Sequence, residues 1–130
     1  MTAITETSES LLRFAIRLDG AVVALLGVAL VAFAGAASAL TGLPTSVEYG
    51  VGALSIAYGP LAFALAARDQ VRTVGLVLAV VNVLTTAGLV VLVLTGVAGL
   101  TATGNALALV VGAYTAAIGG LQYLGARRTP

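Results

Sequence analysis

The sequence predicts an all-helical membrane protein, a bundle of four transmembrane helices with both termini in the cytoplasm. Of its 130 residues, 60% are hydrophobic and only 8% are charged, and the apolar residues gather in long runs. A soluble domain carries roughly 25% charged residues. A small soluble domain also buries only about two-thirds of the surface that its unfolded chain exposes, so water cannot accommodate this much apolar surface. We therefore interpret residues 1–130 as one transmembrane domain.

The predicted spans cover residues 18–40, 47–67, 73–94 and 105–124. Each is close to the roughly 20 residues that cross a hydrocarbon core of about 30 Å. Residues 1–10 include Glu6 and Glu9 and are expected to form a polar, frayed N-terminal tail. Ala37-Ser38-Ala39 resembles a signal-peptide cleavage site. The apolar run before it is longer than that of a typical signal peptide, which favours a membrane span.

Glycine and proline mark the turns between these spans. Gly42 and Pro44 predict a turn after the first span. In the second span, Gly59-Pro60 is expected to kink the helix, because proline removes one backbone donor. Residues 96–104 are uncharged and predict an outer turn.

The arginines predict the topology. All six basic residues are arginine, and they fall in pairs before the first span, between the second and third, and after the fourth: Arg13, Arg17, Arg68, Arg72, Arg127 and Arg128. Cytoplasmic loops carry an excess of basic residues. Only an arrangement with both termini inside satisfies this rule, and we expect a multi-pass protein of the inner (plasma) membrane.

Several residue types are missing, and their absence excludes most chemistry. The chain has no cysteine and no histidine, and its net charge is +1. We therefore expect no metal site, no cofactor and no enzymatic activity, since a hydrolase needs a base beside its nucleophile. Nothing indicates a nucleic-acid partner. The expected partners are the lipid bilayer and either a second copy of the chain or a larger membrane complex.

A stripe of small residues is the most specific packing signal. It recurs at every fourth position of the fourth span: Gly104, Ala108, Gly112, Ala116 and Gly120. Small residues let helix backbones approach closely within a membrane. The stripe predicts either packing inside the bundle or the seam of a homodimer.

Two polar residues are candidates for an active role. Asp19 lies at the start of the first span, and intramembrane carboxylates are often paired or mark ion pathways. Arg17 is two residues away and so faces elsewhere, while Arg72 is a possible ionic partner. Asp19 is thus either a structural anchor or a coupling residue. Asn82, near the middle of the third span, is expected to bond between helices, with Tyr114 as a plausible partner.

Both ends of the chain resemble a known group of proteins. The segments Leu12-Arg13-Phe14-Ala15-Ile16-Arg17-Leu18-Asp19 and Leu121-Gln122-Tyr123-Leu124-Gly125-Ala126-Arg127-Arg128 resemble small four-span bacterial membrane proteins that are common in actinobacteria. The resemblance implies a four-span fold, an Arg-Leu-Asp entrance to the first span, and a polar residue in the third. It implies no activity.

Three roles remain open. The first is a structural, accessory or self-associating bundle without catalytic activity, which a closed interior would favour. The second is a small transporter or channel component that uses Asp19 and Asn82, which a cavity reaching both would favour. The third is a lipid-binding protein whose inner arginines contact anionic headgroups.

Overall fold

The computed structural model describes residues 2–130, and the side chains from residue 7 onward. This part of the chain folds into helices alone: α1 (Thr2–Ala32), α2 (Ala34–Thr41), α3 (Thr45–Ala66), α4 (Val71–Thr95) and α5 (Ala102–Arg128). Four of them, α1, α3, α4 and α5, are long and apolar enough to cross a membrane. The prediction of an all-helical protein with four spans is therefore confirmed.

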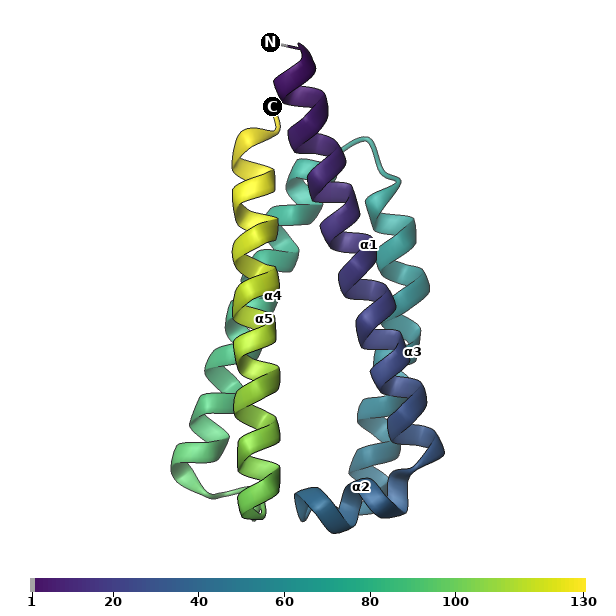
Figure 1. Ribbon diagram of the computed structural model, residues 1–130, viewed down its shortest axis with the longest axis vertical. Coiled ribbons are helices and arrows are strands. Elements are labelled where there is room, and N and C mark those ends of the chain that lie inside the picture. The colour runs from purple at the N-terminus through teal and green to yellow at the C-terminus, as the bar shows by residue number, and fades with distance from the viewer. Residues whose placement is uncertain (1) are drawn as a thin grey trace.

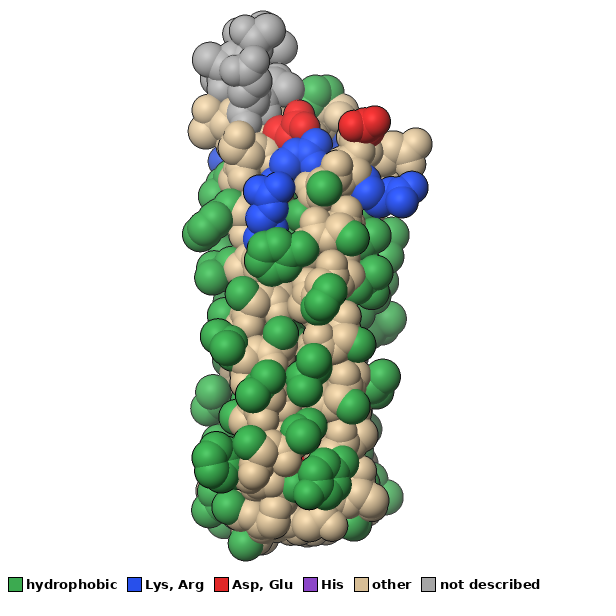
Figure 2. All heavy atoms as spheres, turned by 90° about the vertical axis from the view of Figure 1, so that its right-hand side faces the viewer, with side chains coloured by type: hydrophobic (Ala, Val, Ile, Leu, Met, Phe, Trp, Pro, Cys, Tyr) green, Lys and Arg blue, Asp and Glu red, His purple; other side chains and the backbone are tan. Residues whose placement is uncertain are grey.

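The surface of these helices is suited to lipid. Leu25, Leu54 and Leu94 are 70%, 75% and 79% exposed, which would be costly in water. Hydrophobic side chains cover the length of the molecule, and charged ones gather at one end (Figure 2). A multi-pass membrane protein explains both features.

The first predicted span differs from the structure at both of its ends. The helix already begins at Thr2, within the expected frayed tail, and ends at Ala32 instead of residue 40. Phe33 leaves the helical region with φ −123° and ψ 35°, and Ala34–Thr41 form the separate helix α2. The predicted turn follows, where Gly42 adopts the left-handed conformation (φ 85°) that glycine tolerates. In α3 the helix continues through Pro60 to Ala66.

The long helices form two hairpins, α1 with α3 and α4 with α5 (Figure 1). Within each hairpin the helices pack extensively, whereas α3 and α4 contact each other only weakly, although they follow one another in the chain. Both termini lie at the same end of the molecule, as an even number of spans requires (Figure 1). The short helix α2 lies at the opposite end, beneath the gap between the hairpins (Figure 1).

Glycines bring α1 and α3 into direct backbone contact. A Cβ atom on Gly27 would lie 2.6 Å from the carbonyl oxygen of Gly52, and one on Gly59 would lie 2.7 Å from Cβ of Ala24. A Cβ atom on Gly20 would likewise meet Ala62 at 2.6 Å. These distances leave no room for a side chain. The α1–α3 contact is therefore a small-residue seam of the kind that holds membrane helices together.

The two hairpins meet at their ends. At the arginine end, Leu12 of α1 packs against Gly75 and Gly125 within a buried apolar cluster. At the opposite end, the backbone N–H of Thr101 donates to the Thr41 carbonyl at 2.9 Å, and the Thr101 hydroxyl donates to the Leu40 carbonyl. The middle of the molecule is left less tightly filled.

We predict that Gly52→Ala destabilises the protein by roughly 1–3 kcal/mol, the usual cost of overpacking. Its added methyl group would lie 2.9 Å from the Gly27 carbonyl oxygen and 2.8 Å from Val31. The matched control is Gly50→Ala in the same helix, where a Cβ atom meets nothing within 4 Å. Thermal unfolding in detergent, followed by circular dichroism, should show a lower midpoint for Gly52→Ala alone. Equal midpoints for the two variants would contradict the seam.

Candidate functional site

A cavity of about 590 Å³ lies between the hairpins. All four long helices line it, mostly with valine and leucine side chains. Its polar lining includes Asp19 from α1, Tyr58 from α3, Asn82 from α4 and Tyr114 from α5. The two residues singled out from the sequence thus reach the same cavity.

Asp19 is held by two tyrosines from opposite hairpins. The Tyr58 hydroxyl donates to Oδ2 at 2.7 Å, and the Tyr114 hydroxyl donates to Oδ1 at 2.8 Å. Asp19 itself is only 2% exposed. Both carboxylate oxygens therefore act as acceptors, each from a neutral donor, at the wall of the cavity.

Asp19 lies further along α1 than Arg13 does, toward the middle of the molecule. Arg13, on the same helix, donates to the backbone carbonyls of Ala66 and Arg68 and so caps the C-terminal end of α3. Asp19 follows six residues later, about 9 Å further along the helix axis toward the middle of the molecule. Asp19 thus lies within the part of α1 that is long and apolar enough to span a membrane.

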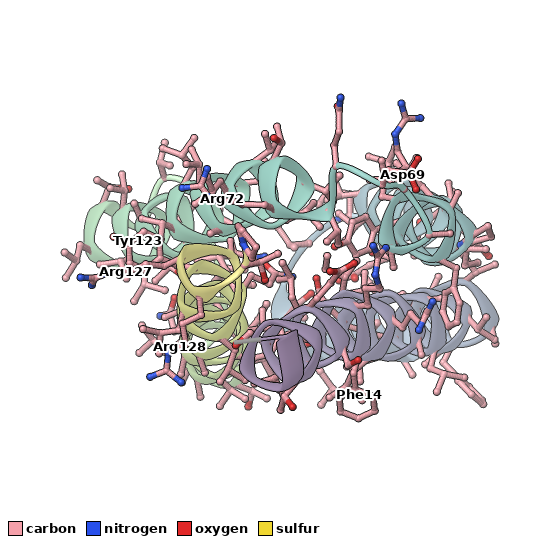
Figure 3. The ribbon with its side chains drawn as sticks, turned by 90° about the horizontal axis from the view of Figure 1, so that it is seen from above. Phe14, Asp69, Arg72, Tyr123, Arg127 and Arg128 are labelled. Atoms are coloured by element: carbon pink, nitrogen blue, oxygen red, sulfur yellow. The ribbon has the colours of Figure 1, made fainter. Side chains whose placement is uncertain are left out.

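Arg72, the expected ionic partner of Asp19, forms no ion pair with it. Arg17 and Arg72 are both exposed. Within the part of the chain whose side chains are described, the ion pair present is that of Arg13 with Glu9. Viewed from the arginine end, Arg127 and Arg128 point outward from α5 (Figure 3). The pairing of Asp19 with Arg72 is therefore wrong, because the space beside the carboxylate is taken by the two phenols.

Asn82 bonds to Gln122 and not to Tyr114. Its Nδ2 donates to Oε1 of Gln122 at 2.9 Å and to the Leu78 carbonyl at 3.0 Å, so that α4 and α5 are joined. Gln122 is fully buried, and its own Nε2 has no hydrogen-bond partner. The bond to Leu78 fixes the orientation of the Asn82 amide, so exchanging the Gln122 oxygen and nitrogen would place two donors face to face.

A second polar contact joins the same two helices one turn away. The Thr86 hydroxyl lies 2.7 Å from that of Thr115 and 3.0 Å from the Gly112 carbonyl oxygen. Hydroxyls on apolar helices commonly bond across an interface in this way. The α4–α5 hairpin is thus held by polar contacts as well as by close packing.

The small-residue stripe of α5 is only partly on its packed face. Gly104 and Gly112 are buried and Ala108 is half-buried, but Ala116 and Gly120 are exposed. Positions four residues apart turn by about 40° per step around a helix, so four steps rotate the stripe by about 160°. Gly119, in place of Gly120, packs against Asn82, where an added Cβ atom would lie 3.0 Å from that of Asn82.

From the sequence, Tyr114 was expected beside Asn82, but its hydroxyl bonds to Asp19 instead. The bonds of Tyr58 to Asp19 and of Asn82 to Gln122 were not predicted. The four-residue spacing of Tyr114, Ile118 and Gln122 puts all three on one face of α5, which is the face that packs inward. This spacing could have indicated that the three residues share the inward face of α5. It could not have shown which helix packs against that face.

Comparison with known proteins adds no further assignment. No family model matches the chain, and neither a curated protein nor a solved structure matches it. The resemblance to small four-span bacterial proteins stays a prediction. The fold and the site indicate a helical, multi-pass membrane protein with a polar cluster between its four long, apolar helices.

We predict that Asn82→Leu costs more stability than Gln122→Leu. Asn82→Leu removes the bond that Gln122 makes, whereas Gln122→Leu removes an unpaired buried donor and leaves Asn82 bonded to Leu78. The double variant should be less damaged than the sum of the two, with a coupling of about 0.6 and at most about 1.7 kcal/mol.

Equilibrium unfolding in mixed micelles measures all three variants. Thr85→Val provides the control, because the Thr85 hydroxyl bonds to Val81 within its own helix. It should leave the midpoint almost unchanged. Strict additivity of the two leucine substitutions would show that the Asn82–Gln122 bond contributes nothing to stability.

Proposed function

We propose that this protein binds a small, mostly apolar molecule within the membrane, as a small transporter or channel component. The observation that carries this proposal is the placement of Asp19, held by Tyr58 and Tyr114, at the wall of a cavity of about 590 Å³. Ligand sites are typically concave, roughly 300–1,000 Å³ in volume, and mainly apolar with a few placed polar groups. This cavity fits that description.

The position of the carboxylate supports a functional role. An acidic group inside a membrane is costly and is seldom kept for packing alone. An apolar residue at position 19 would fill the same space without that cost. A closed, structural bundle, the first interpretation of the sequence, also has no use for a cavity of this size. For both reasons we favour a binding role.

The weak contact between α3 and α4 supports entry from the bilayer. Both helices line the cavity, α3 with Val51 and Tyr58 and α4 with Val81 and Leu89. Their outward side chains are apolar and exposed, as for Leu54 and Val83. A molecule dissolved in the lipid therefore meets no charged barrier on this side.

The arginine end supports a cytoplasmic position for both termini. Five of the arginines are exposed there and free of acidic partners among the described side chains: Arg17, Arg68, Arg72, Arg127 and Arg128. Figure 2 shows the charged side chains at this end and none along the spans that face the viewer. The excess of basic residues is typical of the cytoplasmic side of a plasma membrane, and anionic headgroups can bind such residues.

Cysteine labelling tests the topology. The chain has no cysteine, so Ser46→Cys and Asp69→Cys each introduce a single thiol, and both positions are exposed at opposite ends. In intact cells, an impermeant maleimide should label Ser46→Cys and leave Asp69→Cys unlabelled until the membrane is opened. The reverse pattern would invert the topology.

Filling the cavity tests the binding role. Val111 lines the cavity from α5, so Val111→Phe should exclude a ligand by occupying its space. The matched control is Val91→Phe on the exposed side of α4, at a position that is 55% exposed. Native mass spectrometry of protein taken from its own membranes should find a bound small molecule in the wild type and in Val91→Phe, and much less in Val111→Phe.

Circular dichroism must first show that both phenylalanine variants are folded. Equal occupancy in Val111→Phe and Val91→Phe would show that the molecule binds elsewhere. A wild-type protein that carries no small molecule would contradict the binding role itself.

A further inference from the structure

We propose that the molecule bound at Asp19 is a lipophilic cation, an amine or quaternary ammonium attached to an apolar group. This inference rests on the proposed function and specifies its ligand. It follows from the charges around the cavity, the aromatic groups beside the carboxylate and the apolar character of the remaining wall.

The carboxylate has no charge partner. Asp19 is the only acidic or basic residue among those that line the cavity. Its hydrogen-bond partners, Tyr58 and Tyr114, are neutral phenols, and each occupies one acceptor position of its oxygen. A carboxylate offers about four such positions, so two stay open. A buried negative charge is costly unless it is paired, and a bound cation would supply the missing partner.

The surrounding elements supply no other cation. On α1, the nearest basic residue is Arg17, which is exposed and two residues away. On α3 and α5, the groups that face Asp19 are the two tyrosines, and α4 lines the cavity with Asn82 and Thr85 but no charged residue. The described part of the chain therefore offers no counter-charge beside Asp19, and a bound cation would supply one.

The tyrosines favour a cation over a neutral donor. Both phenol rings line the cavity beside the carboxylate. Aromatic rings attract ammonium groups through their negative faces, and desolvation strengthens the attraction. One carboxylate flanked by two tyrosines thus forms a site for a positive group, even one that has no hydrogen to donate.

The rest of the cavity wall is apolar and favours an apolar group on the ligand. The apolar residues Val22, Leu26, Val51, Leu89 and Val110 also line the cavity. An apolar group attached to the cation would gain about 25 cal/mol per Å² of surface that it buries there. A hydrophilic cation would gain none of this stabilisation, which restricts the ligand to lipophilic cations.

A pair of matched probes tests the charge. 4-Phenylbutylamine and 4-phenylbutanol share one apolar group, but only the amine is positive at pH 7. Equilibrium dialysis against the purified full-length protein in a neutral detergent, with protein-free micelles as the blank, measures both. The wild type should bind the amine at least about tenfold more tightly than the alcohol, as expected for a charge-assisted contact.

Asp19→Asn locates the effect, because it removes the charge and keeps the shape. It should weaken binding of the amine about tenfold or more and leave binding of the alcohol unchanged. Two control variants remove a carboxylate elsewhere. Asp69→Asn acts on the exposed loop, and Glu48→Gln acts on a buried carboxylate that accepts a hydrogen bond from Thr41 and does not line the cavity. Both should bind the amine like the wild type.

The possible failures are distinguishable. If both probes bind equally well, and Val111→Phe abolishes both, the cavity is a ligand site but its ligand is not a cation. If neither probe binds, this inference is overturned, and the native mass spectra of the wild type and Val111→Phe decide the proposed function separately. The comparison of the two probes uses the wild-type protein, so it decides the question even if Asp19→Asn does not fold.

Discussion

The direct contact between the backbones of α1 and α3 is the constraint on which the remaining architecture depends. Lipid tails are as apolar as leucine, so no hydrophobic effect drives two such helices together, and close packing must do so instead. Glycine at positions 20, 27, 52 and 59 removes the side chains that would keep the helices apart. The α4–α5 hairpin combines close packing at Gly119 with the hydrogen bonds of Asn82 and Thr86.

Between the two hairpins, close packing of this kind is confined to the two ends of the molecule. The presence of close-packed seams within each hairpin, and their absence from the middle of the contact between the hairpins, therefore explains why the cavity lies between the hairpins.

This arrangement decides where polar groups can lie. Asn82 and Gln122 lie inside a tight hairpin, where an amide group has few neighbours to bond with. Gln122 illustrates this, because its Oε1 accepts a hydrogen bond from Asn82 whereas its Nε2 has no partner. Asp19 sits between the hairpins instead. Its bond to Tyr58 stays within one hairpin, whereas its bond to Tyr114 joins the two. Among the hydrogen bonds of the described residues, the others that join the hairpins come from Thr101, at the end of the molecule opposite the arginines. The carboxylate is therefore both part of the cavity wall and part of what links the two hairpins.

The sequence was sufficient for those features that depend on composition and length. Four spans and the separation of arginines to one end follow from runs of residues that need no knowledge of neighbours. It was insufficient wherever the outcome depends on which helix faces which. The stripe from Gly104 to Gly120 has a period of four residues, whereas an α-helix has 3.6 residues per turn. The last members of the stripe therefore lie outside the packed face of α5. Arg72 was a reasonable partner for Asp19 by charge, but Tyr58 and Tyr114, 39 and 95 residues away in the chain, reach the carboxylate instead. The end of the first helix at Ala32 could not be predicted either, because the residue that leaves the helical conformation is Phe33 and not a proline or glycine.

The double role of Asp19 also sets a condition on any ligand that binds there. A molecule that uses the open acceptor positions of the carboxylate leaves the bond to Tyr114 in place, and the two hairpins stay linked. A molecule that displaces the Tyr114 hydroxyl must replace one charge-assisted hydrogen bond before it contributes any net affinity. In doing so it removes the polar link between the hairpins at this depth, and their relative position then rests on the contacts of Leu12 and Thr101 at the two ends. A ligand shifts a conformational equilibrium only by its difference in affinity for the two states. At this site, that difference is decided by whether Tyr114 is kept or displaced, so the geometry of one phenol hydroxyl connects ligand binding to the packing of the whole molecule.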